Sequence, residues 1–148
     1  MDSILNTLEE RFAFALHNTA RAWRCALDKR LKHLGLSQAS WTTFAVVYKA
    51  QQPLSQVELA NRVGIEAATM VATIDRLVKA GFLRRESAAH DRRVKLVVLT
   101  DSGKQLVDKV MTEANKFRDE LLVGVDKRQL LAATEWLEHL QSMAEAVT

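Results

Sequence analysis

Leu83-Arg-Arg-Glu-Ser-Ala-Ala-His-Asp-Arg-Arg-Val-Lys-Leu-Val-Val-Leu-Thr-Asp-Ser-Gly103 is the stretch of this chain that decides the fold. Strand-forming apolar residues stand on both sides of it, at Leu83 and at Leu96–Leu99, and the connecting segment Ser87–Arg93 is small and polar. The pattern predicts a β-hairpin. Five Lys and Arg against two acids lie between Leu83 and Leu96, and a basic loop on a stiff ribbon suits the minor groove of DNA. The alternative is a charged, solvent-exposed hairpin that binds nothing.

Two short helices are predicted directly before this hairpin. Ser55-Gln-Val-Glu58 forms a capping box that starts a helix ending near Arg62. Gly64 then separates it from a second helix, from about Glu66 to Ala80. Two helices joined by a tight turn with glycine are typical of a helix-turn-helix. The predicted fold class is therefore mainly α with a small β-hairpin wing, in which a winged helix-turn-helix is joined to long N- and C-terminal helices.

The second helix of this pair has two faces. Its buried stripe is predicted to consist of Val71, Ile74, Leu77 and Val78. The opposite face is slim enough to approach base edges and is predicted to present Ala68, Thr69, Ala72, Thr73 and Arg76.

The remaining helices are long and amphipathic. One apolar pattern runs from Leu8 to Leu31 before Gly35, a second from about Ser40 to Ala50, a third from Thr100 or Asp101 to about Val123, and the last starts at a capping arrangement on Asp126. The apolar stripes of the first, third and last of these helices exceed what one small domain can cover. We therefore predict dimerisation helices in 1–36 and 104–148 around a DNA-binding domain in 37–103, with a homodimer preferred over packing within one chain.

Composition excludes several classes of protein. The hydrophobic content of 48% is that of a globular chain, and neither a signal peptide nor a run of about 18 apolar residues is present. The single Cys25 allows no intrachain disulfide, which favours the cytoplasm. The four histidines lack metal-ligand spacing, and no nucleophile has a matching base. We expect no membrane contact, no metal, no cofactor and no enzymatic activity.

The positive charge is unevenly distributed. The net charge is only +3, but residues 105–148 carry five Lys and Arg against eight Asp and Glu, a balance of −3, which leaves +6 for residues 1–104. A local excess of cations attracts a polyanion. The predicted partner is double-stranded DNA.

DNA capture needs cations along phosphates and a few side chains that reach bases. Phosphate contacts are predicted for Ser55, Gln56, Arg76 and Lys79, and base contacts for Ala68, Thr69, Ala72 and Thr73. The wing is predicted to contribute Arg92, Arg93 and Lys95. Asp91 stands two residues before Arg93, a spacing that lets its carboxylate orient the guanidinium toward a narrow groove.

The run Asp91–Gly103 resembles the wing signature of the MarR family, in which an Asp-x-Arg pair precedes Leu-Thr-x-x-Gly. Further segments are similar to the SlyA branch: Trp23-Arg24, Asp28, Arg30–Lys32, Leu34, Leu36, Gln38, Trp41, Gly64–Glu66 and Thr73–Leu77. The resemblance spans about residues 12–104. It implies a homodimeric transcription regulator bound to a pseudo-palindromic operator and released by small aromatic carboxylates, with Arg93 as its wing arginine and residues 66–76 as its recognition helix.

The resemblance also implies an effector pocket, and it shows departures from the branch. Arg21 and Trp41 match pocket residues that would pair with a carboxylate and stack on a ring. Two neighbouring pocket positions that are polar in SlyA-like proteins are occupied by Ala39 and Ala45 in this chain. On the recognition helix, Ala72 replaces a base-reading arginine common in SlyA-like proteins, and relatives tend to carry proline at the position of Ala68.

Two other functions stay open beside a ligand-responsive repressor or anti-repressor. One is a winged-helix module whose wing grips a protein, although the local cations and the Asp-x-Arg spacing argue against it. The other is redox sensing through Cys25, which has Arg24 and Lys29 close in sequence. A lone cysteine of this kind is more often buried packing.

Overall fold

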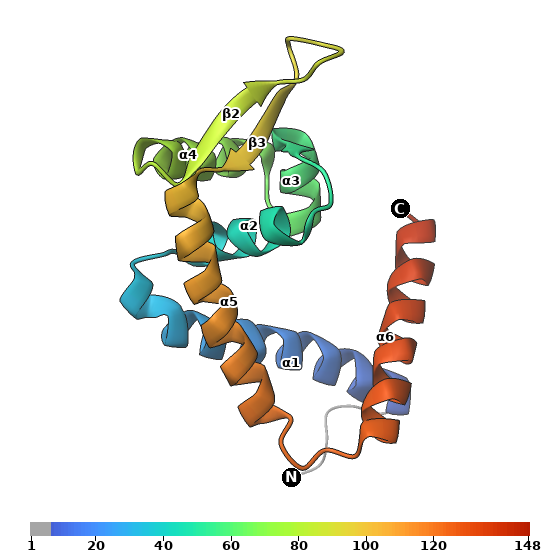
Figure 1. Ribbon diagram of the computed structural model, residues 1–148. Helices are drawn as coiled ribbons and strands as arrows, with labels where there is room; N and C mark the ends of the chain where they lie inside the picture. The colour runs from blue at the N-terminus through green and yellow to red at the C-terminus, as the bar shows by residue number, and fades with distance from the viewer. Residues whose placement is uncertain (1–6) are drawn as a thin grey trace. The chain divides into compact units, whose positions relative to one another are not determined.

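The structure is a computed structural model that describes residues 7–148, and Figure 1 shows its elements. The helices are α1 (Leu8–Leu31), the 3-10 turn η1 (Lys32–Leu34), α2 (Gln38–Lys49), α3 (Gln56–Val63), α4 (Ala67–Lys79), α5 (Asp101–Leu121) and α6 (Lys127–Ala146). The strands are β1 (Leu54–Ser55), β2 (Leu83–Ser87) and β3 (Lys95–Leu99). The predicted fold class, mainly α with a small β-hairpin wing, is confirmed. The first six residues of the predicted segment 1–36 lie outside the described residues.

Helix starts are fixed by the side chains that the sequence indicates. The Ser55 hydroxyl accepts from the amide of Glu58 at 3.2 Å, and the Glu58 carboxylate accepts from the amide of Ser55 at 3.4 Å, so the predicted capping box is confirmed. Asp126 accepts from the amides of Arg128 and Gln129 at the start of α6. At the end of α3, Gly64 has a φ of 78°, a left-handed conformation that favours glycine and turns the chain toward α4.

The sheet has three antiparallel strands in the order β1-β3-β2. In the hairpin Leu83 pairs with Leu99 and Ser87 with Lys95, so the predicted wing is confirmed. The third strand was not predicted. It comprises only Leu54 and Ser55, paired with Val97 and Leu96, and two residues are too few to show an alternating pattern.

One hydrophobic core joins the helix-turn-helix to the base of the hairpin. Phe44 of α2, Leu59 of α3, Ile74 of α4, Leu83 of β2 and Val97 of β3 are all buried in it. Figure 1 shows β2 and β3 continuing beyond these helices as a hairpin whose tip stands clear of them. The core therefore fixes the base of the wing and leaves the basic tip exposed to solvent.

The buried stripe of α4 shares only Ile74 and Leu77 with the prediction, since Val78 is partly buried. Met70 is fully buried, and Val71, which was predicted to be buried, is 38% exposed. Thr73 is fully buried, although it was predicted on the open face. The stripe therefore runs through Met70, Thr73, Ile74 and Leu77, which still follows the 3.6-residue period. A threonine can occupy a core position when its hydroxyl bonds to the carbonyl four residues earlier.

The chain divides into two compact units, one up to Asn115 and one from Lys116 to Thr148. In the second unit α6 has no buried residue. In the first, all residues from Leu8 to Ala22 of α1 are exposed, and the stripe of α1 becomes buried only at Leu27 and Leu31. Both helices thus expose apolar side chains. Among residues 7–148, no helix combines the length and the apolar content that a membrane span requires.

Candidate nucleic-acid interface

The open face of α4 presents short side chains. Ala68, Thr69 and Ala72 are exposed there, and Arg76 and Lys79 are exposed nearer the end of the helix. The N-terminal residue Glu66 makes no capping bond with its side chain, so this end of the helix presents amide groups and the positive end of the helix dipole. A slim face with methyl and hydroxyl groups, followed by cations, fits a groove lined by phosphates.

Thr73 does not belong to this open face. Its hydroxyl donates to the carbonyl of Thr69 at 2.8 Å, and Arg76 donates to that hydroxyl at 3.4 Å. The prediction that Thr73 is presented for base contact is therefore wrong for this structure, because the side chain is buried and its hydroxyl is already bonded. Arg76 gains a local partner that holds its side chain along the helix.

Ser55 and Gln56 lie at the start of α3, as the sequence predicts. The Ser55 hydroxyl oxygen is occupied by its capping bond, and Gln56 accepts through Oε1 from Nε of Arg85 at 2.6 Å. The donors that remain for a phosphate are the hydroxyl proton of Ser55 and the side-chain amide nitrogen of Gln56. Both donors stand at a helix N-terminus, where an anion is favoured.

The wing tip is shaped by Asp91. One of its carboxylate oxygens accepts from the backbone amide of Arg93 at 2.9 Å and lies 3.6 Å from Nε of the same residue. The amide of Val94 donates to the carbonyl of Asp91, and the amide of Ala88 donates to the carbonyl of Val94, which closes the loop. Asp91 therefore fixes the turn through the main chain and faces the guanidinium as well. The side chain of Arg93 is 95% exposed beyond the turn.

The cations of the ribbon have different surroundings. Arg84 pairs with Glu86 on the same strand at 2.9 Å, and Lys95 donates to the hydroxyl of Ser87 on the facing strand at 2.9 Å. Arg85 instead reaches out of the sheet to Asp75 of α4 at 2.5 Å as well as to Gln56. From the sequence alone, Arg85 counts only as one of the five cations of the predicted hairpin. Its place on the same strand face as Leu83 was the signal that its side chain lies toward the helices, although this signal does not identify the partner.

The two residues predicted to bind an effector lie on different helices. Arg21 of α1 is exposed and donates to Asn18 at 3.2 Å. Trp41 of α2 is only 6% exposed, and its indole N–H donates to Asp28 of α1 at 3.0 Å. Arg21 and Asp28 are two turns apart on α1, about 10 Å at 1.5 Å per residue. Arg21 therefore lies on the same helix face as Asp28, the partner of Trp41.

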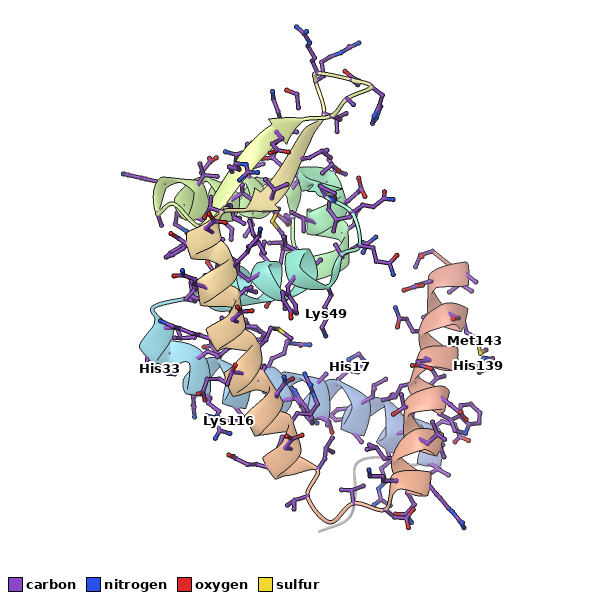
Figure 2. All side chains as sticks on the ribbon, viewed as in Figure 1. His17, His33, Lys49, Lys116, His139 and Met143 are labelled. Carbon is purple, nitrogen blue, oxygen red and sulfur yellow. The ribbon has the colours of Figure 1, made fainter. Side chains whose placement is uncertain are left out.

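Two further expectations concern Cys25 and the hollows of the surface. Cys25 is exposed, so the expectation that it is buried packing is wrong. An open hollow of about 730 Å³ lies beside β1 and is lined in part by Lys49, Arg62 and His90; Figure 2 shows Lys49 projecting from α2. Neither Arg21 nor Trp41 lines this hollow. Within residues 7–148, no group of three or more His, Cys, Asp or Glu side chains is suited to hold a metal ion.

Comparison with known proteins places these features in a family. A family model described as MarR family matches residues 34–94. The transcriptional regulator PA3341 is 36% identical over 90% of this chain and 98% of its own, with a TM-score of 0.86. The fold is shared with CouR from Rhodococcus jostii RHA1, solved with p-coumaroyl-CoA (22% identity, 95% and 96% covered, TM-score 0.79). It is also shared with BpsR from Bordetella bronchiseptica, whose DNA binding is regulated by 6-hydroxynicotinic acid (20% identity, 93% and 97% covered, TM-score 0.77).

Proposed function

This chain belongs to the MarR family of transcription regulators, and on that premise we propose that it acts in the cytoplasm as a homodimer on a pseudo-palindromic operator and responds to a small aromatic carboxylate. One observation carries the proposal: the short-chained open face of α4 and the exposed Arg93 at the wing tip belong to one unit with a shared core. In a winged helix-turn-helix these two parts enter neighbouring grooves of DNA.

Each exposed group has a role set by its chemistry. Thr69 is the hydrogen-bonding residue toward a base edge, and the methyl groups of Ala68 and Ala72 suit the methyl group of thymine. Phosphate contacts fall to Ser55, Gln56, Arg76, Lys79, Arg92 and Lys95. Since Ala72 replaces the arginine expected in SlyA-like proteins, Arg93 in the minor groove supplies a large share of the affinity.

The homodimer is supported by apolar side chains that one chain leaves exposed. On α6 the exposed fractions are 64% for Trp136, 48% for Leu137 and 55% for Met143, and on α1 Phe12 and Phe14 are 49% and 57% exposed. Figure 2 shows Met143 and His139 on one side of α6. Many large aromatic and aliphatic side chains left exposed are typical of an interface rather than of a free surface. We propose a second copy of this chain as the partner of residues 1–36 and 104–148.

The proposed effector is a small aromatic carboxylate bound near Arg21 and Trp41. Support comes from the exposed guanidinium of Arg21 and from the hydrogen bond that joins Trp41 to α1. A ligand that replaced this bond would loosen α2 from α1 and so shift the population of the DNA-binding conformation. The segments similar to SlyA-like proteins, from Trp23 to Trp41, support a place in that branch.

Replacing Arg21 by glutamine is expected to abolish the response to such effectors, because the carboxylate loses its cation. Benzoate and 4-hydroxybenzoate at millimolar concentration should release the unaltered protein from its DNA and should leave Arg21→Gln bound. Arg24→Gln, an exposed arginine of the same helix, is the matched control and should respond normally. Equal responses of all three proteins would contradict the assignment of Arg21.

The regulatory function itself is tested by sedimentation of the purified protein with a labelled duplex. We expect a complex of two chains per duplex whose affinity falls steeply between about 50 and 200 mM salt, since each phosphate contact releases counterions. A dimer with no duplex affinity at low salt would instead favour a protein-binding wing, and a monomer at micromolar concentration would contradict the homodimer.

A further inference from the structure

Arg85 differs from its neighbour Arg84 in where it points. Side chains alternate along a strand, so Arg85 shares the face of Leu83, which is buried against the helices, and Arg84 lies on the other face. The side chain of Arg85 is 27% exposed, against 57% for Arg84. Two adjacent arginines of one hairpin thus occupy different environments.

The guanidinium of Arg85 joins three elements. Its Nε donates to Oε1 of Gln56 in α3 at 2.6 Å, and one terminal nitrogen donates to Oδ1 of Asp75 in α4 at 2.5 Å. A guanidinium carries its donors on different atoms of one rigid plane, so it holds both acceptors in a fixed geometry. Because Asp75 lies ten residues before Arg85 in sequence, this contact spans the junction between the recognition helix and the wing.

The junction matters for DNA binding because α4 and the wing tip are proposed to enter different grooves of the duplex. The core fixes only the base of the hairpin, and any change of angle there is carried to Arg93 at the tip. We propose that Arg85 is a positioning residue that fixes the hairpin relative to α4, so that both grooves are engaged in one geometry. This inference rests on the proposed function of DNA binding.

A rival role is direct contact of Arg85 with a phosphate. The two roles predict opposite effects for Asp75, whose side chain is 60% exposed beside the proposed DNA face. If Arg85 bound phosphate, Asp75→Asn would free its guanidinium, remove a negative charge near the duplex and strengthen binding. If Arg85 positions the wing, the same change weakens its ion pair and weakens binding.

The test compares Asp75→Asn with Glu86→Gln by titration of a bound duplex at fixed salt. Glu86 is the matched control, because its carboxylate also pairs with an arginine of the hairpin but the pair stays within β2. We expect Asp75→Asn to weaken binding about tenfold, as a coupling of about 1.4 kcal/mol implies, and Glu86→Gln to bind as well as the unaltered protein or more tightly. Circular dichroism and thermal unfolding should show that both variants are folded.

Two additional measurements separate positioning from general loss of structure. Arg85→Lys keeps the charge but replaces the rigid guanidinium by a single ammonium on a flexible stem, so positioning predicts weaker binding and a phosphate contact predicts little change. Footprinting of Asp75→Asn should lose minor-groove protection at the wing and keep major-groove protection under α4. Unchanged or tighter binding by Asp75→Asn, or uniform loss of both protections, would overturn the inference while the DNA-binding function stands. Absence of duplex binding by the unaltered protein would overturn both.

Discussion

Replacing Arg93 by alanine is expected to weaken duplex binding about thirtyfold, the loss that removal of one groove-reading arginine produces. Arg93 stands at the wing tip with 95% of its side chain exposed and with its turn fixed by Asp91. Such an arginine loses little conformational freedom when it enters a narrow minor groove. Because Ala72 leaves the recognition helix without an arginine at that position, a larger share of the affinity depends on Arg93.

The measurement is fluorescence anisotropy of a labelled operator duplex at several salt concentrations. Arg93→Ala should lower the slope of the logarithm of affinity against the logarithm of salt by about one, and its loss should be largest on operators with A·T-rich flanks. Arg24→Ala, which removes an exposed arginine of α1, is the control and should bind normally. Equal affinities of the two variants would show that the wing does not enter the groove.

Replacing Gly103 by alanine is expected to destabilise the fold by about 3 kcal/mol, the upper part of the range for overpacked sites. A Cβ at this position would lie 2.0 Å from the carbonyl oxygen of Phe82 and 3.0 Å from its carbonyl carbon. The clash is with main-chain atoms, which cannot move away by a change of rotamer as a side chain can. The same turn is held by Thr100, whose hydroxyl donates to the carbonyl of Gly81 and accepts from the amide of Gly103.

Thermal and denaturant unfolding at one fixed protein concentration measures this effect, since oligomerisation changes apparent stability. Ser102→Ala alters the adjacent exposed residue and should change stability by less than about 0.5 kcal/mol. A Gly103→Ala protein as stable as the Ser102→Ala protein would show that α5 does not begin against Phe82 as described. The pair of variants thus tests the close packing behind the Leu-Thr-x-x-Gly pattern.

Local features of the fold could be predicted because their causes are local. The capping box at Ser55, the turn at Gly64 and the hairpin around Ser87–Arg93 each depend on residues a few positions apart. The position of Thr73 could not be predicted this way. Thr73 can be buried because its hydroxyl donates to the carbonyl of Thr69 within the helix. This bond lets a polar residue lie on the same buried helix face as Met70 and Leu77.

Side-chain contacts between different helices and strands could not be predicted from the sequence. Nothing in the spacing of Asp75 and Arg85 indicates that they meet, because this depends on how β2 crosses α4. The same holds for Trp41 and Asp28, thirteen residues apart on two helices. For Arg21 and Trp41 the resemblance to a family supplied the prediction, and the structure adds that Trp41 is nearly buried. Their ligand contact stays a prediction.

Sequence-specific DNA binding is tested most directly by selection of bound sequences from a random duplex pool with the purified full chain. Binding by a homodimer predicts enrichment of one pseudo-palindrome whose half-sites are centred about 10 bp apart or a multiple of this, as two copies on one face of DNA require. It also predicts that thymine is preferred where Ala68 and Ala72 face the major groove and that A·T pairs are preferred under the wings. A pool that remains random after repeated selection at low salt would contradict sequence-specific binding.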